Sequence, residues 1–478
     1  MIKFFIDQHG CAKNQVDGEI IASKLIDDGF EMVDSFDAAD FIIINTCGFI
    51  ESAKKESLDA VYNIRASYPK KKIVLAGCLA ERYADVFKEN LEEVNGIFGN
   101  GDLLLISDLL NSIKKRPVIV SEQTGVSVYK RNTFFNFKNS AYVKITEGCS
   151  NHCSFCAIPV IRGELRSRPI KDVVKEVQSL IKKGFFEINL IGQDLAAFGT
   201  GEEDKKIFGS LRSEDTDKDY GNEKKTSASR NCGQKNSTSY LSLLLDEISK
   251  IEGKFWIRLL YIHPDHFNFD VVERIKKDNR ILAYFDIPFQ SGDTEIIRSM
   301  NRTGSKETYI KLVKKLRKEL PDAALRTTLM TGFPGETEQA FANSKDFLET
   351  IKPDWSGCFA YSREEDTPAY KFKNRVSKKI SEARAKELES IQEEITQQKL
   401  KSRLKKDYDV LIEEVLDAED DQGFAIARAW FQAPDVDGAF VVRYDRDDKK
   451  AVKAVVPGNV VKVRAVKVSG VDIDSVLL

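Results

Sequence analysis

The cysteines are the residues of this chain whose types and spacing most directly indicate chemistry. Three of them, Cys149, Cys153 and Cys156, form a CxxxCxxC pattern in the run GCSNHCSFC. Three thiolates at this spacing can wrap one cubane iron–sulfur cluster within a single loop. Three protein ligands on four irons leave one iron open, and an open metal position is what a catalytic site requires.

A zinc knuckle is the alternative for these three thiols. Zinc requires four ligands, and His152 is the only nearby candidate, held between two of the cysteines in a poor geometry. The paired CxxC…CxxC spacing typical of zinc is also missing. The cluster is therefore favoured, and His152 is predicted to be a solvated loop residue.

Three further cysteines follow predicted strands in residues 1–125. Strands are expected at 2–6, 41–45 and 72–76 and helices at 16–28 and 52–66, so Cys11, Cys47 and Cys78 each come just after a strand. Strand–helix alternation predicts a parallel sheet, and the carboxyl ends of its strands share one edge. The three thiols can therefore converge on a metal cluster. The alternative is three inert thiols buried in the core.

A second α/β region is predicted over 135–375, with strands at 142–146, 187–191, 256–260, 284–287, 325–330 and 357–361. Six strand–helix units predict a partial or complete barrel, which places its chemistry at the carboxyl ends of the strands. Helices are expected over 173–183 and 306–319, among others. Cys358 falls in the middle of a strand and is expected to be a small core residue.

Three other segments complete the organisation. Residues 200–239 are rich in Gly, Ser and charge and are predicted to be a disordered insertion, which contains Cys232. Residues 376–405 are charged and helix-favouring, and predict a linker helix. Residues 406–478 show period-2 runs separated by turn signals, which predict a small β-barrel.

Composition restricts the class of protein further. The 478 residues include 73 basic and 75 acidic side chains, a net charge of −2, so a nucleic-acid role requires a local basic patch. No stretch approaches the ~20 apolar residues of a membrane span, and the N-terminus lacks the features of a signal peptide. A cytoplasmic location is expected, where patterned cysteines indicate metal binding or catalysis rather than disulfides.

Eight motifs, in order, resemble those of the radical-SAM methylthiotransferases: GCAKNQVDGE, INTCGFI, LAGCLAERY, ITEGCSNHCSFCAIPVIRGELRSRP, LIGQDLAAFG, MNRTG, LRTTLMTGFPGET and FAYSREEDTPA. The resemblance covers nearly the whole chain apart from the insertion. It implies an α/β protein with an N-terminal parallel α/β cluster domain, a radical-SAM (β/α) barrel and a C-terminal small β-barrel of the TRAM type, which is OB-like.

The same resemblance implies the cofactors, two 4Fe–4S clusters and S-adenosyl-L-methionine. One cluster is implied on Cys149, Cys153 and Cys156, where the open iron chelates S-adenosylmethionine and its cleavage yields a 5′-deoxyadenosyl radical. An auxiliary cluster is implied on Cys11, Cys47 and Cys78, whose sulfur is inserted into the substrate radical. With only four histidines in the chain, no general base or nucleophilic triad is evident.

Two branches of this family differ in substrate: a ribosomal protein of the small subunit, modified on an aspartate β-carbon, or a transfer-RNA adenosine. The motifs IGQD, WIRLLYIHP and AWFQAPDVDG resemble the ribosomal-protein branch, whereas Ser291 in DIPFQSGD departs from that branch's usual histidine. Residues 406–478 carry 15 acidic and 10 basic side chains, a net of −5, which suits a basic protein better than RNA.

The ribosomal-protein branch is therefore preferred. A reductant such as flavodoxin or ferredoxin is expected as a further partner. No membrane partner is expected, and the acidic barrel is not expected to bind nucleic acid directly. The transfer-RNA branch is the runner-up. A zinc-stabilised RNA-binding protein without catalysis is the alternative from a different class. Metal content separates that class from the two enzymes.

Beyond the cysteines, four residues are predicted to contact the cofactor from loop or strand-end positions: Phe155, Gln193, Arg326 and Glu336. For Phe155 the alternative is an ordinary loop anchor. One of the three arginines in IRGELRSRP (Arg162, Arg166 and Arg168) is expected to reach a carboxylate of cofactor or substrate, or else to fix the cysteine loop to the helix that follows. The glycine-rich run TGFPGE lacks the Lys-Ser/Thr ending of a phosphate loop.

Overall fold

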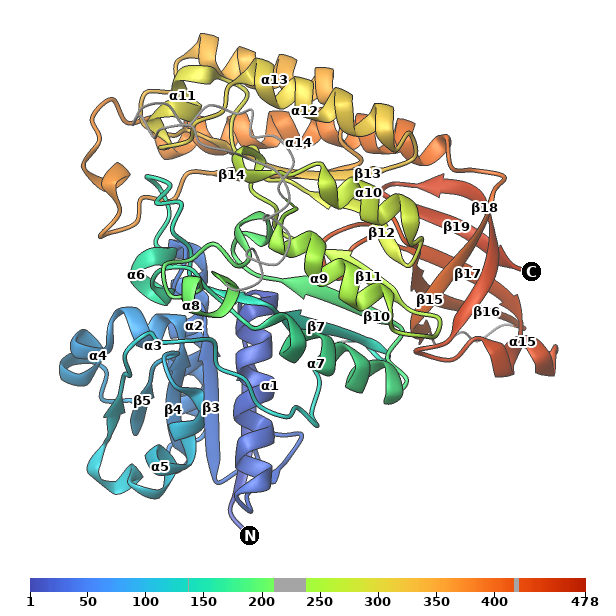
Figure 1. Cartoon of the computed structure of the whole chain (residues 1–478). Helices are drawn as coiled ribbons and strands as arrows, with labels where there is room; N and C mark the ends of the chain where they lie inside the picture. Colours follow the sequence, from blue (N-terminus) through green and yellow to red (C-terminus); the bar gives the residue numbers. More distant parts are fainter. Residues whose placement is uncertain (136, 210–237, 417–420) are drawn as a thin grey trace.

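The structure is a computed structural model of the chain, and it describes residues 1–135, 137–209, 238–416 and 421–478. Figure 1 shows three units: an N-terminal α/β unit in blue, a central α/β unit from green to orange, and a C-terminal β-barrel in red. Among the described helices, none combines the length and the apolar character needed to cross a membrane.

The N-terminal unit is a six-stranded parallel sheet of order β2-β1-β3-β4-β5-β6. Its strands are β1 (Lys3–Gln8), β2 (Glu31–Met32), β3 (Phe41–Thr46), β4 (Lys72–Gly77), β5 (Gly96–Phe98) and β6 (Val118–Ile119). Its helices are α1 (Ala12–Asp27), α2 (Glu51–Ser67), α3 (Cys78–Arg82), α4 (Ala84–Asn90) and α5 (Ile106–Asn111), with 3₁₀ turns at Leu103–Leu105 and Ile113–Lys115.

Both faces of this sheet are buried, as its apolar strands require. Along β3, Phe41 and Ile43 join the cluster formed with α1 and α5. Ile42 and Ile44 join the cluster on the opposite face, with Val61 of α2. Because successive side chains of a strand point to opposite faces, the run FIII supplies both cores at once.

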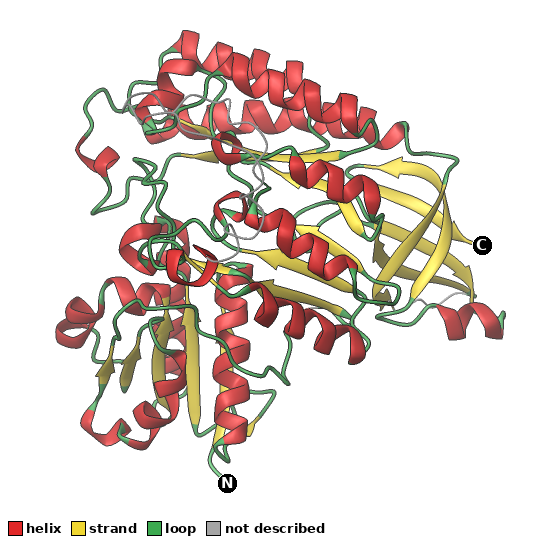
Figure 2. Ribbon diagram, viewed as in Figure 1, coloured by secondary structure: helices red, strands yellow, loops and turns green. Residues whose placement is uncertain are grey.

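The central unit is a second six-stranded parallel sheet, of order β14-β13-β12-β11-β10-β7. Its strands are β7 (Ser140–Lys144), β10 (Glu187–Ile191), β11 (Trp256–Leu259), β12 (Ile281–Asp286), β13 (Ala324–Thr331) and β14 (Trp355–Ala360), and β8 (Thr146–Glu147) pairs with β9 (Arg166–Ser167). The sheet curves into a partial barrel with helices on its outer side (Figure 2).

The helices of the central unit cover the outer side of this sheet. In α7 the buried residues Val173, Val177 and Leu180 recur at helical spacing and join the cluster with β7 and β10. The helices are α6 (Ile158–Arg162), α7 (Ile170–Lys182), α8 (Lys205–Phe208), α9 (Tyr240–Ser249), α10 (Asp270–Lys277), α11 (Thr294–Ser299), α12 (Lys306–Glu319), α13 (Glu338–Ile351) and α14 (Lys378–Lys401), with 3₁₀ turns at Leu195–Ala197, Pro264–His266 and Pro368–Lys371.

The prediction of a disordered segment over 200–239 is wrong at its start. Residues 205–208 form α8, and Phe208 is buried against Phe198 and Tyr240, with ring centroids 5.3 and 4.9 Å apart. Because a buried aromatic ring offsets the ordering entropy of a short polar stretch, this stretch is part of the fold. Residues 210–237, and Cys232 with them, lie outside the described residues. Cys358 is buried in β14, as predicted.

The C-terminal unit is a closed barrel of order β15-β16-β17-β19-β18, with β15 (Asp407–Leu416), β16 (Gln422–Arg428), β17 (Phe440–Asp445), β18 (Val460–Ser469) and β19 (Asp472–Leu477), plus α15 (Lys449–Ala454). It docks on the amino ends of the central strands. Glu187, the first residue of β10, receives hydrogen bonds from Arg258 of β11 at 2.8 Å and from Arg428 of β16 at 2.7 Å, and all three side chains are buried. Arg428 also pairs with Glu413 of β15, so a buried group of four charges fixes the barrel.

The N-terminal unit contacts both edges of the open sheet of the central unit. Helix α1 packs against β7 at one edge. At the other, Glu364, which follows β14, accepts hydrogen bonds at 2.8 Å from both Lys54 of α2 and Arg82 of α3. The N-terminal unit therefore spans the opening of the partial barrel at the carboxyl ends of its strands.

Candidate active site

Cys11, Cys47 and Cys78 lie at neighbouring strand ends of the N-terminal sheet. Cys11 is the residue before α1, Cys47 follows the last residue of β3, and Cys78 begins α3 directly after β4. Thr46 of β3 pairs with Gly77 of β4, so Cys47 and Cys78 leave the sheet at the same level. The structure thus brings this predicted trio together at one edge.

Two glycines allow this close approach. A Cβ added at Gly10 would lie 3.1 Å from the Cβ of Cys47, and Gly10 has a positive φ of 87°. A Cβ added at Gly48 would lie 2.7 Å from the carbonyl oxygen of Cys78. Side chains at either position would push the three cysteine segments apart.

The electrostatics of the trio differ from thiol to thiol. Burial raises the pKa of Cys47 to about 12, and the neighbouring Cys78 and Cys11 add to the rise. Burial likewise raises the pKa of Cys78. For Cys11 burial also acts upward, but the positive charges of Lys13 and Arg162 outweigh it and lower the pKa. The mutual effects of the thiols are those expected of groups that share a site.

Cys149, Cys153 and Cys156 lie in a loop after β8 that is docked on the motif MNRTG. Ser154 N–H donates to the carbonyl of Met300 at 3.0 Å, and the Asn301 side chain donates to the carbonyl of His152 at 2.9 Å. Cys156 N–H donates to the carbonyl of Cys153 at 3.0 Å, which turns the loop back on itself. These hydrogen bonds fix the loop that carries the three cysteines.

Burial raises the pKa of Cys149 to about 12 and that of Cys156 above its ordinary value, and in both cases the other thiols of the loop contribute. His152 takes no part. Its Nε2 lies 3.2 Å from Glu164, and its side chain is 55% exposed, as predicted for a solvated loop residue.

His263 lies closer to this trio, with Nε2 3.9 Å from the Sγ of Cys153. Its Nδ1 accepts the N–H of Asp265 at 3.3 Å, so the proton of the neutral ring sits on Nε2 and points at the sulfur. Burial lowers the pKa of His263 to about 3, which keeps the ring neutral. In this tautomer His263 donates to the thiolate and does not offer zinc a fourth ligand.

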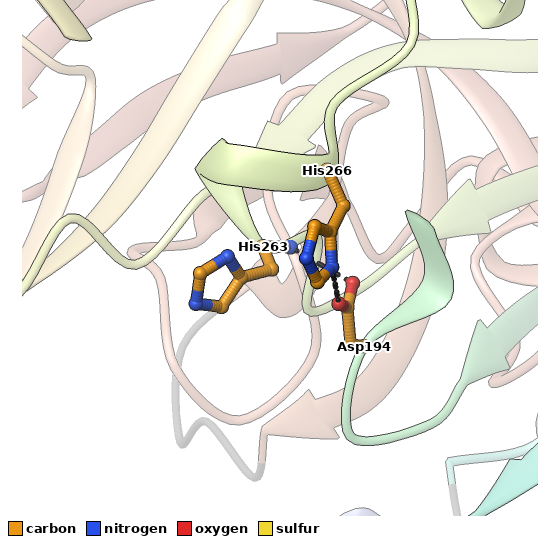
Figure 3. Close-up of side chains that lie close together, drawn as sticks. All are labelled: Asp194, His263 and His266. Carbon is orange, nitrogen blue, oxygen red and sulfur yellow. Dashed lines mark hydrogen bonds and ion pairs between the residues drawn. The ribbon is translucent and has the colours of Figure 1, made fainter. Parts of the chain in front are cut away.

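A cavity of about 410 Å³ opens beside Cys149, lined in part by Asn151, Asp194, His263 and His266. Asp194, His263 and His266 carry potential metal-binding atoms within 4.8 Å of one another. In Figure 3 the His266 ring faces the Asp194 carboxylate while the His263 ring points aside.

The Asp194 carboxylate is fully engaged by protein donors. It accepts hydrogen bonds from Ala196 N–H, His263 N–H, the Asn151 amide and His266, at 2.8–3.1 Å. Burial raises the pKa of Asp194, but these bonds and the two histidines outweigh it and hold the pKa at about 2. The group therefore shapes the loop after β10 rather than binding a metal.

The two cysteine trios are neighbours. Cys78 packs in one buried apolar cluster with Ala157, the residue after Cys156, and with Ile161 of α6. From the end of the same helix, Arg162 donates to the Sγ of Cys78 at 3.1 Å. The loop that carries one trio thus touches a member of the other.

Arg162 belongs to a buried group of four charges between the N-terminal and central units. It donates to Asp17 of α1 at 2.8 Å and to Glu147 of β8 at 2.7 Å. Lys144 of β7 pairs with the same two carboxylates. Two cations and two anions balance one another, which such deep burial requires.

The other arginines of IRGELRSRP fix the loop. Arg166 donates to the carbonyl oxygens of Gly125, Glu164 and Arg162, and Arg168 pairs with Glu176 of α7. Arg168 therefore fixes the cysteine loop to the following helix. This is the second of the two roles expected for these arginines.

The four residues predicted to contact the cofactor occupy different settings. Phe155, which lies within the cysteine loop, packs against the buried cluster that contains Phe333. Gln193 donates to Glu147 at 3.4 Å, while its Oε1 is buried without a partner in the described part of the chain. Such an orphaned acceptor fits a ligand that donates there.

Arg326 and Glu336 are engaged elsewhere. Arg326 lies 3.3 Å from Asp286 and 3.4 Å from Asp437, the latter in the C-terminal unit. Glu336 accepts the N–H of Gly332 at 2.6 Å and a hydrogen bond from Arg384 of α14 at 2.7 Å. Both side chains hold elements of the fold together in this structure.

Two trios of thiols, each brought together by the fold and each without a fourth ligand among the residues that the structure describes, fit a cubane cluster with one open iron better than tetrahedral zinc. Several residues that surround them were not predicted from the sequence: Lys13, Asp17, Glu147, His263 and Arg302, the last of which hydrogen-bonds with Cys153. The signal available was the presence of charged residues inside the cysteine motifs, as in GCAKNQVDGE.

Three family models match successive parts of the chain: Uncharacterized protein family UPF0004 over residues 3–99, Radical SAM superfamily over 143–348, and TRAM domain over 406–477. The fold and these matches define a radical-SAM enzyme with a C-terminal TRAM domain. The solved structure of the radical S-adenosylmethionine methyltransferase TsrM from Kitasatospora setae shares this fold, with a TM-score of 0.50 and 13% identity over 77% of this chain and 76% of that one.

Among curated proteins, the ribosomal protein uS12 methylthiotransferase RimO of Treponema denticola is 47% identical over 98% of this chain and 100% of its own. The protein of the same name from Natranaerobius thermophilus is 38% identical over 91% of each chain. The chain belongs to the RimO family of methylthiotransferases. The predicted family, fold class and enzyme class are confirmed, and S-adenosylmethionine and 4Fe–4S clusters are the cofactors.

Proposed function

We propose that this enzyme adds a methylthio group to the β-carbon of an aspartate in ribosomal protein uS12. The proposal is supported by relatives that carry this activity in their names and align over nearly the whole chain. The observation that carries it is the contact between the two cysteine sites, Cys78 against Ala157. A reaction that joins a substrate radical to sulfur needs two metal sites around one cavity.

In this proposal Cys149, Cys153 and Cys156 bind the cluster that holds S-adenosylmethionine, and Cys11, Cys47 and Cys78 bind the auxiliary cluster. When bound, these groups supply a carbon radical that removes a hydrogen atom, sulfur for insertion, and the methyl group. Gln193, with its orphaned Oε1, and Phe155, within the cysteine loop, contact the adenosyl cofactor.

The chain's own residues position and shield these sites. The N-terminal unit spans the open side of the partial barrel and is held at both edges by buried ion pairs. Exclusion of water protects a radical from side reactions and strengthens electrostatic interactions inside. Neutral His263 donates to Cys153, and Arg162 donates to Cys78, so each trio receives a hydrogen bond that stabilises its thiolate form.

The remaining partners follow from the proposed reaction. A one-electron donor such as flavodoxin or ferredoxin reduces the clusters, in the cytoplasm where ribosomes are assembled. The C-terminal barrel, with a net charge of −5 over residues 406–478, faces a basic protein rather than RNA phosphates. Its role is to orient the ribosomal substrate.

The test is anaerobic turnover of the reconstituted enzyme with intact small ribosomal subunits and, in parallel, with transfer RNA. We expect mass spectrometry to find one methylthio group in place of hydrogen on an aspartate of uS12, and unmodified transfer RNA. A methylthio group on transfer RNA with uS12 unchanged would replace this function by that of the transfer-RNA branch.

Metal analysis of the same preparation tests the non-catalytic alternative. About eight irons per chain, with matching labile sulfide, are expected for two 4Fe–4S clusters. Zinc without labile sulfide would leave a zinc-stabilised binding protein as the function.

A further inference from the structure

Lys13 is a buried lysine at the junction of the N-terminal and central units. It lies in the first turn of α1, two residues after Cys11, and is 8% exposed. Its Nζ donates to the carbonyl of Gly192 at 3.3 Å and lies 3.5 Å from the centroid of the Tyr261 ring. Gly192 follows β10 and Tyr261 follows β11, so the ammonium reaches the carboxyl edge of the central sheet.

Within the described residues no carboxylate oxygen lies within 4 Å of the Nζ of Lys13, and the acidic group on which its charge acts is the thiol of Cys11, whose pKa it lowers. Lys144, the other buried lysine of this junction, is paired with both Asp17 and Glu147. A carbonyl and an aromatic face offset only part of the cost of burying an ammonium group. One of its three N–H groups is left without a protein acceptor, so the site is complementary to an anion.

The position of Lys13 restricts what that anion can be. The ammonium lies between Cys11 of one trio and the strand-end loop of Gly192, next to Gln193. An anion bound here would lie between Cys11 and the carboxyl edge of the central sheet, which is where the proposed reaction brings the substrate. An adenine base brings no negative charge to such a place, whereas an aspartate side chain brings a carboxylate directly bonded to its β-carbon.

We propose that Lys13 binds the side-chain carboxylate of the aspartate that is modified, and is therefore a residue that determines substrate specificity. This inference rests on the proposed function. A charge-assisted hydrogen bond from Lys13 fixes the carboxylate, and with it the β-carbon one bond away. The aromatic face of Tyr261 keeps the ammonium in place while leaving its free N–H for the substrate.

The experiment compares the binding of purified uS12 with that of a uS12 variant in which the target aspartate is asparagine. Fluorescence anisotropy under anaerobic conditions, with the reconstituted enzyme and labelled uS12, gives both dissociation constants. For the unmodified enzyme we expect the aspartate form to bind about 10- to 100-fold more tightly, the range of one charged hydrogen bond.

In Lys13→Met, which keeps the length of the side chain, this preference disappears because only the aspartate form loses affinity. Lys13→Gln should behave in the same way, and Lys13→Arg should keep part of the preference. Lys24→Gln is the matched control, since Lys24 lies on the same helix and pairs with Asp28. It should leave the preference intact.

Iron content and the EPR spectrum of each variant are measured alongside. If Lys13→Met keeps the full preference for aspartate, with or without a change in the clusters, Lys13 only offsets cluster charge and the inference is wrong. If the unmodified enzyme neither binds nor modifies uS12, the proposed function itself has failed. If the unmodified enzyme modifies uS12 but binds both uS12 forms equally, only the role proposed for Lys13 is contradicted.

Discussion

The guanidinium of Arg162 donates to the Sγ of Cys78 across 3.1 Å, so the helix after the CxxxCxxC loop contacts a cysteine at the end of a strand in another unit. The same side chain pairs with Asp17 and Glu147. One residue therefore connects both cysteine sites to each other and to the junction of the two units.

Replacing Arg162 by methionine should destabilise the enzyme and weaken its auxiliary cluster. The change leaves two buried carboxylates, Asp17 and Glu147, with Lys144 as their only cation, at a cost of about 3–5 kcal/mol in the free energy of unfolding. Urea unfolding measures this loss, and iron analysis should show less metal at Cys11, Cys47 and Cys78. Arg298→Gln, which removes an exposed ion pair, is the control. Full iron content and unchanged stability in Arg162→Met would contradict this role.

Glu187 is expected to hold the C-terminal barrel on the central unit. In Glu187→Leu, Arg258 becomes a buried cation without an anion and Arg428 keeps only Glu413 of its two carboxylate partners, so the free energy of unfolding should fall by about 3–5 kcal/mol. Limited proteolysis should then cleave between α14 and β15. Asp407→Asn, on the exposed pair with Arg464 of the same barrel, should change neither readout.

Glu364 should give the contact between the N-terminal and central units a defined pH dependence. Burial acts to raise its pKa, but hydrogen bonds from Lys54, Ser362 and Arg82 outweigh it and lower the pKa below the ordinary 4.5. The resulting stability is present above pH 4.5 and is lost as the pH falls through the lowered pKa of the folded state.

Urea unfolding of the unmodified enzyme and of Glu364→Gln at several pH values measures the contribution of Glu364 to the free energy of unfolding. The variant should be less stable at pH 7, and the difference should shrink below about pH 4. Glu382→Gln, an exposed carboxylate on α14 paired with Lys378 of the same helix, is the control. A difference independent of pH would mean that the carboxylate charge of Glu364 does not hold the two units together.

Local patterns in the sequence predict much of this architecture. The run FIII predicts β3, and the IKDVVKEVQSLIK spacing predicts α7, because both patterns depend only on which face of an element is buried. The thiols of Cys11, Cys47 and Cys78 could be brought together from sequence alone, since parallel strands share their carboxyl edge.

Contacts between units could not be predicted in this way. The partners of Arg162 and Arg326 lie in other units, and nothing in the spacing of IRGELRSRP or LRTTLMTGFPGET specifies them. Lys13 was part of a recognised motif, yet its contacts with Gly192 and Tyr261, and its lack of a carboxylate partner, are visible only in the folded structure. The ordered structure of residues 205–208 depends likewise on packing against Phe198 and Tyr240, which lie before and after the segment in the sequence.

The central claim is that two clusters, one on each cysteine trio, share one cavity, and EPR of the reduced enzyme tests it most directly. Two variants provide the reference spectra: one with Cys11, Cys47 and Cys78 replaced by alanine, and one with Cys149, Cys153 and Cys156 replaced. Each should retain about four irons. The spectrum of the unmodified enzyme should differ from the sum of the two by a magnetic interaction between the clusters. A spectrum equal to that sum, or a variant that keeps all its iron, would contradict it.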